Sequence, residues 1–236
     1  MLAKNSKVKT ILVACAAILA ISIFCVWENN AITTTQIQYV NPKIPEEFNG
    51  YRIVHISDLH NKLFGKAQER LLEKIRAVSP DIIVITGDLI DRRKFDLETA
   101  MVFVRGAVKI APVYYVSGNH EAWSGAYSNI SQALKSSGVH VLDDTKTTLV
   151  KGKGKIEILG LSDPDFLRYS YLDGTNTSKL KEHLERLSDD AIFQILLCHR
   201  PELFDIYVRE NLDLIFRSEE HTSELQSHSD LVCRLL

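Results

Sequence analysis

Side chains of the kinds that bind metal ions follow four short apolar runs of this sequence. Asp58 and His60 follow the first run and Asp88 follows the second, and the later runs are followed by Asn119, His120, Glu121 and His199. If the runs are strands of an open α/β sheet, these residues share the crevice at the carboxyl ends of the strands, where ligands bind. The order and type of the residues therefore predict one shared pocket.

Carboxylate, imidazole and amide oxygen together make a ligand set for divalent cations such as manganese, iron or zinc, with no thiolate required. Two cations about 3.5–4 Å apart can activate a water and neutralise charge on the attacking and leaving oxygens of a phosphoryl group. The pattern predicts phosphoester hydrolysis. Each residue alone also has an ordinary structural explanation, because an Asp after a strand often caps a helix and Gly118-Asn119 suits a tight turn. Only the combination favours a metal site.

The elements that must position these residues follow from the spacing of apolar side chains. Residues 53–56, 82–85 and 113–116 predict buried strands, and the segments between them, 71–78 and 97–108, have helical periodicity. This alternation predicts an α/β fold with a largely parallel sheet. The second half of the chain predicts a hairpin around Gly152 and Gly154, then a helix at 180–187 and strands at 193–197 and 212–216.

The N-terminal segment has the pattern of a membrane helix. Residues 11–27 are apolar apart from Ser22 and follow three lysines, Lys4, Lys7 and Lys9. The pattern favours an uncleaved anchor over residues 1–28, with a cleaved signal peptide as the alternative. Because basic residues precede the run and Glu28 follows it, the N-terminus is expected in the cytoplasm and the catalytic domain outside it. Residues 29–50 are polar and predict a tether.

Composition limits the other possibilities. The formal net charge is -2 and the hydrophobic share is 45%, so a sizeable core is expected and the basic surface of a stable nucleic-acid binder is not. Four cysteines, at positions 15, 25, 198 and 233, form no disulfide framework and leave the redox compartment open.

The segments HISDLH, ITGDLID and VSGNHE, with His199 after a later strand, resemble the signature of the calcineurin-like metallophosphoesterases, in particular their small bacterial membrane-associated members. The resemblance covers residues 51–216. It implies a metallophosphoesterase-type β-sandwich flanked by helices, preceded here by one transmembrane helix. It also implies that Asp58 and His60 hold one metal, that Asp88 bridges two, and that Asn119 and His199 hold the second.

The same resemblance implies a reaction. A hydroxide that bridges the metals would attack the phosphorus of a phosphomonoester or phosphodiester. His120, which is not a ligand in the family, would face the substrate and stabilise or protonate the leaving oxygen. Glu121 stands in the place of the acidic residue that follows this histidine. The membrane anchor tilts the expected substrate towards lipid-linked phosphates.

The sequence departs from the family after Phe216. Family members carry a Gly-His-x-His there, with one histidine for each metal, whereas this chain continues RSEEHTSELQS. That segment resembles a translated frame of a sequencing adapter, so residues 217–236 are expected to be a non-native, solvated tail. Glu219 and His221 fall near the missing histidines. We therefore expect impaired activity, and the alternative is a catalytically silent metal-binding or scaffold module.

Overall fold

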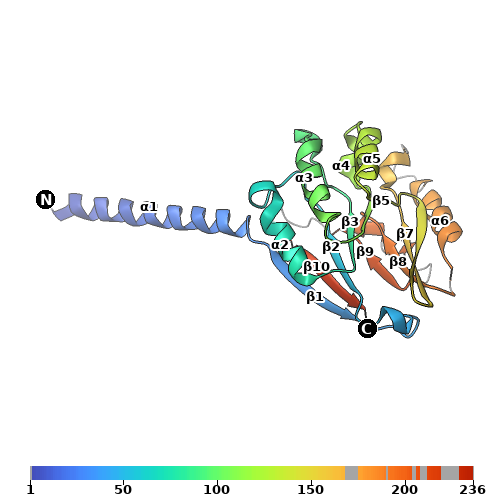
Figure 1. The fold of residues 1–236 in the computed structure, drawn as a ribbon. Helices are drawn as coiled ribbons and strands as arrows, with labels where there is room; N and C mark the ends of the chain where they lie inside the picture. The colour runs from blue at the N-terminus through green and yellow to red at the C-terminus, as the bar shows by residue number, and fades with distance from the viewer. Residues whose placement is uncertain are drawn as a thin grey trace. The chain divides into compact units, whose positions relative to one another are not determined.

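The computed structural model describes residues 2–167, 175–189, 191–203, 206–207, 212–218 and 229–235. By its contacts the chain forms two units, one built on the N-terminal helix and one that is the α/β domain. The helix α1, Leu2–Glu28, contains an apolar window, Ile11–Glu28, with a mean hydropathy of 2.4. Its side chains in that window are exposed. Length and composition therefore suit a membrane span, as the sequence predicted (Figure 1).

The larger sheet of the domain has six strands in the order β1-β10-β2-β3-β4-β5. Their bounds are β1 Thr33–Tyr39, β10 Ser229–Leu235, β2 Arg52–Ile56, β3 Ile82–Thr86, β4 Val113–Val116 and β5 His140–Val141. From β2 to β5 the neighbours are parallel, and β10 is antiparallel to β2. The connecting helices, which lie along one face in Figure 1, are α2 Glu69–Val78, α3 Leu97–Ala107, α4 Asn119–Trp123 and α5 Tyr127–Ser136.

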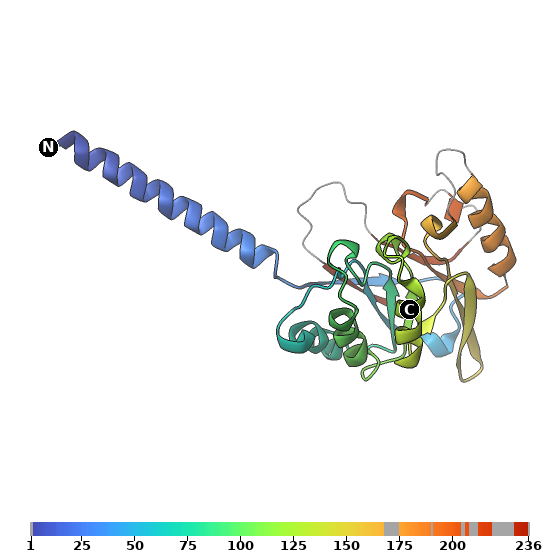
Figure 2. The same ribbon diagram turned by 90° about the horizontal axis from the view of Figure 1, so that it is seen from above.

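The smaller sheet has the order β6-β7-β8-β9. Its strands are β6 Thr145–Lys151, β7 Gly154–Gly160, β8 Phe193–Leu197 and β9 Leu214–Phe216. The first two form the predicted antiparallel hairpin, and β7, β8 and β9 run parallel. The helix α6, Thr175–Leu187, lies beside this sheet, and Figure 2 shows the same order of layers from above.

One core joins the two sheets. Val84 of β3 and Val116 of β4 belong to the same buried cluster as Ile158 of β7 and Ile195 of β8. Successive strand residues point to opposite faces. Ile83 and Ile85 are also fully buried, so β3 is covered on both sides, as expected of a parallel strand.

On the other face of the smaller sheet, Leu159 and Leu196 cluster with Leu180 and Leu184 of α6. The predicted sandwich flanked by helices is confirmed.

Two segments differ from the sequence expectation. The predicted tether contains β1 and a 3-10 helix, Glu46–Phe48, whose Phe48 is 1% exposed in the core between the sheets. Apolar side chains among the polar ones therefore fix this segment to the domain. In the predicted solvated tail, residues 229–235 form β10, which pairs with β2.

Candidate metal centre

The loops that follow β2 and β3 are joined by backbone hydrogen bonds at the carboxyl end of the larger sheet. The N–H of His60 donates to the carbonyl oxygen of Asp88 at 2.9 Å, and that of Asp58 donates to Gly87 at 3.3 Å. Asp58, His60 and Asp88 have φ values of 55°, 45° and 53°, in the left-handed region that side chains disfavour. Such strain gathers at functional sites. Here the left-handed backbone directs the three donor side chains towards one point.

Two glycines allow the loops after β3 and β4 to approach each other. Gly87 has φ 87°, and a Cβ there would lie 2.6 Å from the Cα of Gly118. A Cβ on Gly118 would lie 2.3 Å from Oδ1 of Asp88. Any larger residue would push these loops apart, so both glycines are required for the donors to meet.

Asp88 lies between two histidines. Its Oδ2 is 3.6 Å from Nε2 of His60 and 3.5 Å from Nε2 of His199. Nε2 of His60 is also 3.7 Å from Oδ1 of Asp58, and Nε2 of His199 is 2.9 Å from Oδ1 of Asn119. All five predicted metal ligands therefore come together, although four strands of both sheets carry them.

These residues fit divalent cations. Donors of one ion, each about 2.0–2.2 Å from it, stand roughly 3–3.6 Å apart, which is the spacing around Asp88. Asp58, Asp88 and His199 form one group of possible ligands with atoms within 4.8 Å, and His60, Asp88 and His120 form another. Nδ1 of His60 is buried and has no hydrogen-bond partner in the described part of the chain.

His199 is oriented as a metal ligand. Its Nδ1 is 2.7 Å from the carbonyl oxygen of Thr86, which can only accept, so the ring proton lies on Nδ1. With Asn119 in this orientation, Nε2 of the neutral ring and Oδ1 of Asn119 are two acceptors that face each other, which suits a proton or a cation between them. A backbone acceptor on the second ring nitrogen is the usual way in which proteins orient a histidine ligand.

The charges of Asp88 and His199 are coupled. Burial alone raises the pKa of Asp88, but the hydrogen bond and charge of His199 hold that pKa below its ordinary value. Burial lowers the pKa of His199, but the hydrogen bond and charge of Asp88, helped by Asp58 and Asp163, raise it to about 10. A cation that binds Nε2 must therefore displace a proton.

His120 lies in the first turn of α4, beside the predicted ligands. The N–H of Arg92 donates to its Nδ1 at 3.2 Å, so the proton of the neutral ring is on Nε2. Burial lowers the pKa of His120, which favours that neutral form. Its ring meets the His60 ring edge to face, with 4.4 Å between centroids. His120 therefore lies next to the predicted ligand His60, and its role towards a substrate stays a prediction.

Glu121 has a different environment from the one expected of a catalytic residue. The side chain is fully buried, and its oxygens accept the backbone N–H groups of Asp88 at 2.8 Å, Gly118 at 2.8 Å and Ile90 at 3.2 Å. Burial and the charge of Asp88 raise the pKa of Glu121 to about 7, against the effect of the three donors. The geometry favours a residue that positions the loops after β3 and β4 over one that touches substrate.

Sequence reasoning missed two contacts of the site. The backbone carbonyl oxygen of Thr86 orients His199, and a main-chain contact cannot be predicted from residue types. Ser218 donates its hydroxyl to Oδ2 of Asp58 and its N–H to the carbonyl oxygen of His199 at 3.1 Å. Ser218 belongs to the segment predicted to be non-native, so nothing in its sequence pointed to the site.

The profile of the calcineurin-like phosphoesterases matches residues 51–223. The chain belongs to this family. As a calcineurin-like phosphoesterase it is related to hydrolases that act on phosphoesters with divalent metals. An uncharacterised metallophosphoesterase of Campylobacter jejuni is 26% identical over 216 residues, which cover 89% of this chain and 54% of that protein.

Other relatives of this phosphoesterase include a transmembrane protein with a metallophosphoesterase domain from Bos taurus, 26% identical over 83% of this chain and 45% of that protein. A UDP-2,3-diacylglucosamine pyrophosphatase of Chlamydia trachomatis is 36% identical over 77 residues, or 30% of this chain and 23% of that protein. The chain spans about half the length of the first curated relatives it matches.

Among solved structures, a phosphopantetheinyl hydrolase of Mycobacterium tuberculosis has a similar fold. The TM-score is 0.53 at 15% identity, and the match covers 78% of this chain and 89% of the other. At this identity the likeness concerns the fold alone.

Proposed function

We propose that the domain is a dinuclear metal-dependent phosphoesterase. The observation that carries this proposal is the place of Asp88, whose Oδ2 is 3.6 Å from His60 on one side and 3.5 Å from His199 on the other. A carboxylate between two imidazoles is suited to bridge two cations.

In this proposal Asp58 and His60 would hold one cation, Asn119 and His199 would hold the other, and Asp88 would be shared by both. The oxygen and nitrogen donors suit manganese, iron or zinc. When bound, the two cations supply an activated water and neutralise charge on the phosphoryl oxygens.

The chain itself supplies a hydrogen-bond donor for the leaving oxygen. The neutral ring of His120 holds its proton on Nε2 because the N–H of Arg92 occupies Nδ1. A donor placed where negative charge develops stabilises the leaving oxygen and contributes about 10²–10³-fold to the rate. Glu121 keeps the backbone of Asp88 and Gly118 in register and acts through them.

For the substrate we propose a phosphomonoester or phosphodiester that is lipid-linked. The apolar helix α1 and the relative that acts on a diacylglucosamine nucleotide support this choice. The lysines before the apolar window support a cytoplasmic N-terminus, which would leave the domain outside the cytoplasm.

We also propose that residues 51–216 are the catalytic domain and that residues 217–236 are non-native. Ser218 then occupies the position of the glycine in Gly-His-x-His and Glu219 that of the first histidine, while His221 falls at the second. Loss of a ligand weakens metal affinity strongly, so hydrolysis by this chain is expected to be impaired.

A restored motif tests the proposal. Ser218→Gly combined with Glu219→His recreates Gly-His-x-His, because His221 is already present. The double variant should gain manganese- or zinc-dependent hydrolysis of bis(p-nitrophenyl) phosphate, and Ser218→Gly alone should not.

Metal content separates the alternatives. Two bound metals with hydrolysis support the enzyme, whereas a restored variant that binds no metal and stays inactive supports the silent scaffold. Steady hydrolysis by the unchanged chain would contradict the proposed impairment.

A further inference from the structure

Two neighbouring loops at the carboxyl end of the larger sheet combine basic and apolar side chains. Residues 61–66 follow β2 and residues 91–95 follow β3; we call them together the basic loop pair. Leu63 is 49% exposed and Phe95 is 46% exposed, although both are large apolar side chains. Apolar side chains that are exposed together with basic ones mark a candidate interaction surface.

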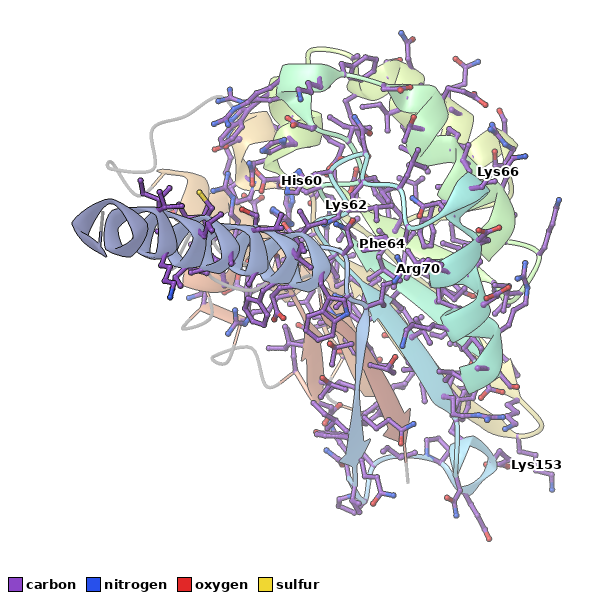
Figure 3. The ribbon with its side chains drawn as sticks, turned by 90° about the vertical axis from the view of Figure 1, so that its left-hand side faces the viewer. His60, Lys62, Phe64, Lys66, Arg70 and Lys153 are labelled. Carbon is purple, nitrogen blue, oxygen red and sulfur yellow. The ribbon has the colours of Figure 1, made fainter. Side chains whose placement is uncertain are left out.

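The two loops form one surface. The side-chain amide of Asn61 donates to the carbonyl oxygen of Lys94 at 2.8 Å, and the N–H of Asn61 donates to Leu89 at 3.0 Å. Figure 3 shows Lys62 beside His60, with Phe64, Arg70 and Lys66 along the same side of the domain.

The basic loop pair carries a local excess of positive charge. It contains five basic side chains, Lys62, Lys66, Arg92, Arg93 and Lys94, and one acidic side chain, Asp91. The carboxylate of Asp91 accepts the N–H of Arg93 at 2.8 Å. Of the acidic residues that follow the loops, Asp96 caps α3 through Thr99, and Glu69 starts α2. The net charge of the whole chain is -2, so the excess of positive charge on the two loops is local and does not reflect the overall composition.

Exposed apolar side chains surrounded by lysine and arginine suit the interface of a membrane. Apolar groups enter the boundary between headgroups and acyl chains, while basic side chains attract anionic headgroups. A nucleic acid would use the charge but leave Leu63 and Phe95 uncovered. We propose that the basic loop pair docks onto an anionic phospholipid bilayer.

Covalent connection supports this partner. The helix α1 ends at Glu28 and β1 begins at Thr33. A chain of that length spans at most about 17 Å. If α1 crosses a bilayer, the domain cannot leave its surface, and even weak docking then has a high effective concentration.

Docking would bring the bilayer next to the candidate metal centre. His60 directly precedes the first loop, and Arg92 of the second loop donates its N–H to His120. The docking proposal does not depend on hydrolysis, because it concerns only where the surface binds.

Hydrogen exchange of the full chain in lipid nanodiscs tests the proposal. Two preparations are compared, one with phosphatidylcholine alone and one with phosphatidylcholine and phosphatidylglycerol. Peptides that cover residues 61–66 and 91–95 should exchange about fivefold more slowly, or slower still, with the anionic lipid, which corresponds to the contribution of a single basic residue near a charged bilayer.

Two double charge-reversal variants change the net charge equally; one alters the basic loop pair and the other is a control elsewhere on the domain. Lys66→Glu with Lys94→Glu should remove the protection. Salt at 0.5 M should remove it too, because it shortens the Debye length well below the value of about 10 Å that applies at about 0.1 M and so screens the attraction between the loops and the bilayer. Lys153→Glu in the turn after β6, combined with Lys155→Glu at an exposed position of β7, should retain it; Figure 3 shows Lys153 far from Lys62.

Equal exchange in the two lipid mixtures would overturn the proposal. Protection that survives in the Lys66→Glu, Lys94→Glu variant would overturn it too, because the basic side chains would then not be the cause. Leu63→Ser with Phe95→Ser should weaken the protection while the net charge is unchanged.

Discussion

Replacement of Glu121 by alanine should destabilise the domain strongly. The change leaves the N–H groups of Asp88, Ile90 and Gly118 without their acceptor in a buried place. A buried donor without a partner costs about 1–3 kcal/mol, so three of them lower the free energy of unfolding by at least about 3 kcal/mol.

Glu121→Gln keeps the shape of the side chain and removes only one of its two acceptor oxygens. An amide oxygen in the place of Oε2 still accepts from Asp88 and Gly118, but the amide nitrogen then meets the N–H of Ile90. One lost acceptor lowers the free energy of unfolding by about 1–3 kcal/mol.

The Gln variant should also lose a dependence on pH. The pKa of Glu121 is about 7 in the folded chain and 4.5 in the reference state, so between these values the folded state keeps a proton that the unfolded state releases. Stability from Glu121 is therefore greatest below pH 4.5 and falls as pH rises to about 7, by up to about 3 kcal/mol. The difference between the parent chain and Glu121→Gln should shrink over that range.

Urea unfolding of the full chain in detergent micelles, followed by far-UV circular dichroism, measures these changes. Glu73→Gln on the exposed face of α2 is the matched control and should change stability by less than about 0.5 kcal/mol. If Glu121→Ala is as stable as this control, the buried acceptor role is refuted.

Three further predictions concern the metal centre. In the Ser218→Gly, Glu219→His background, His120→Ala should slow hydrolysis of an alkyl phosphodiester by about 10²–10³-fold with unchanged metal content; an equal loss with a good leaving group would contradict the role of His120 as a donor to the leaving oxygen. Because the pKa of His199 is about 10, cation binding at pH 7.5 should release about one proton from it. Calorimetry in buffers of different ionisation enthalpy measures that proton, and its absence would contradict the coupling. Gly118→Ala should lower the free energy of unfolding by about 1–3 kcal/mol and weaken metal binding, since its Cβ would lie 2.3 Å from Asp88. Equilibrium dialysis and urea unfolding check both effects, and a fully loaded, stable variant would contradict them.

The strands and helices around the site could be predicted because each has a simple pattern. β2, β3 and β4 are continuous apolar runs, and α2 and α3 have apolar side chains at helical spacing. β1 was missed because most of its side chains are polar and exposed, and β5 has only two residues. α4 is one turn whose existence depends on contacts with the loop after β3.

The predicted ligands came together for the same reason, because strand ends converge in this architecture. What could not be predicted is which atoms hold them. The carbonyl oxygen of Thr86 orients His199, and the carboxylate of Glu121 gathers three N–H groups. Contacts to the main chain leave no trace in residue type, and burial of Glu121 depends on the packed structure.

The left-handed backbone at Asp58, His60 and Asp88 bears on which ions the pocket prefers. These conformations are imposed by the folded domain, so the donors are spaced before any ion arrives. A cage of fixed dimensions cannot contract around a small cation or widen around a large one. Ionic radius, rather than the general rise in affinity from manganese to copper, would then govern which metal occupies it.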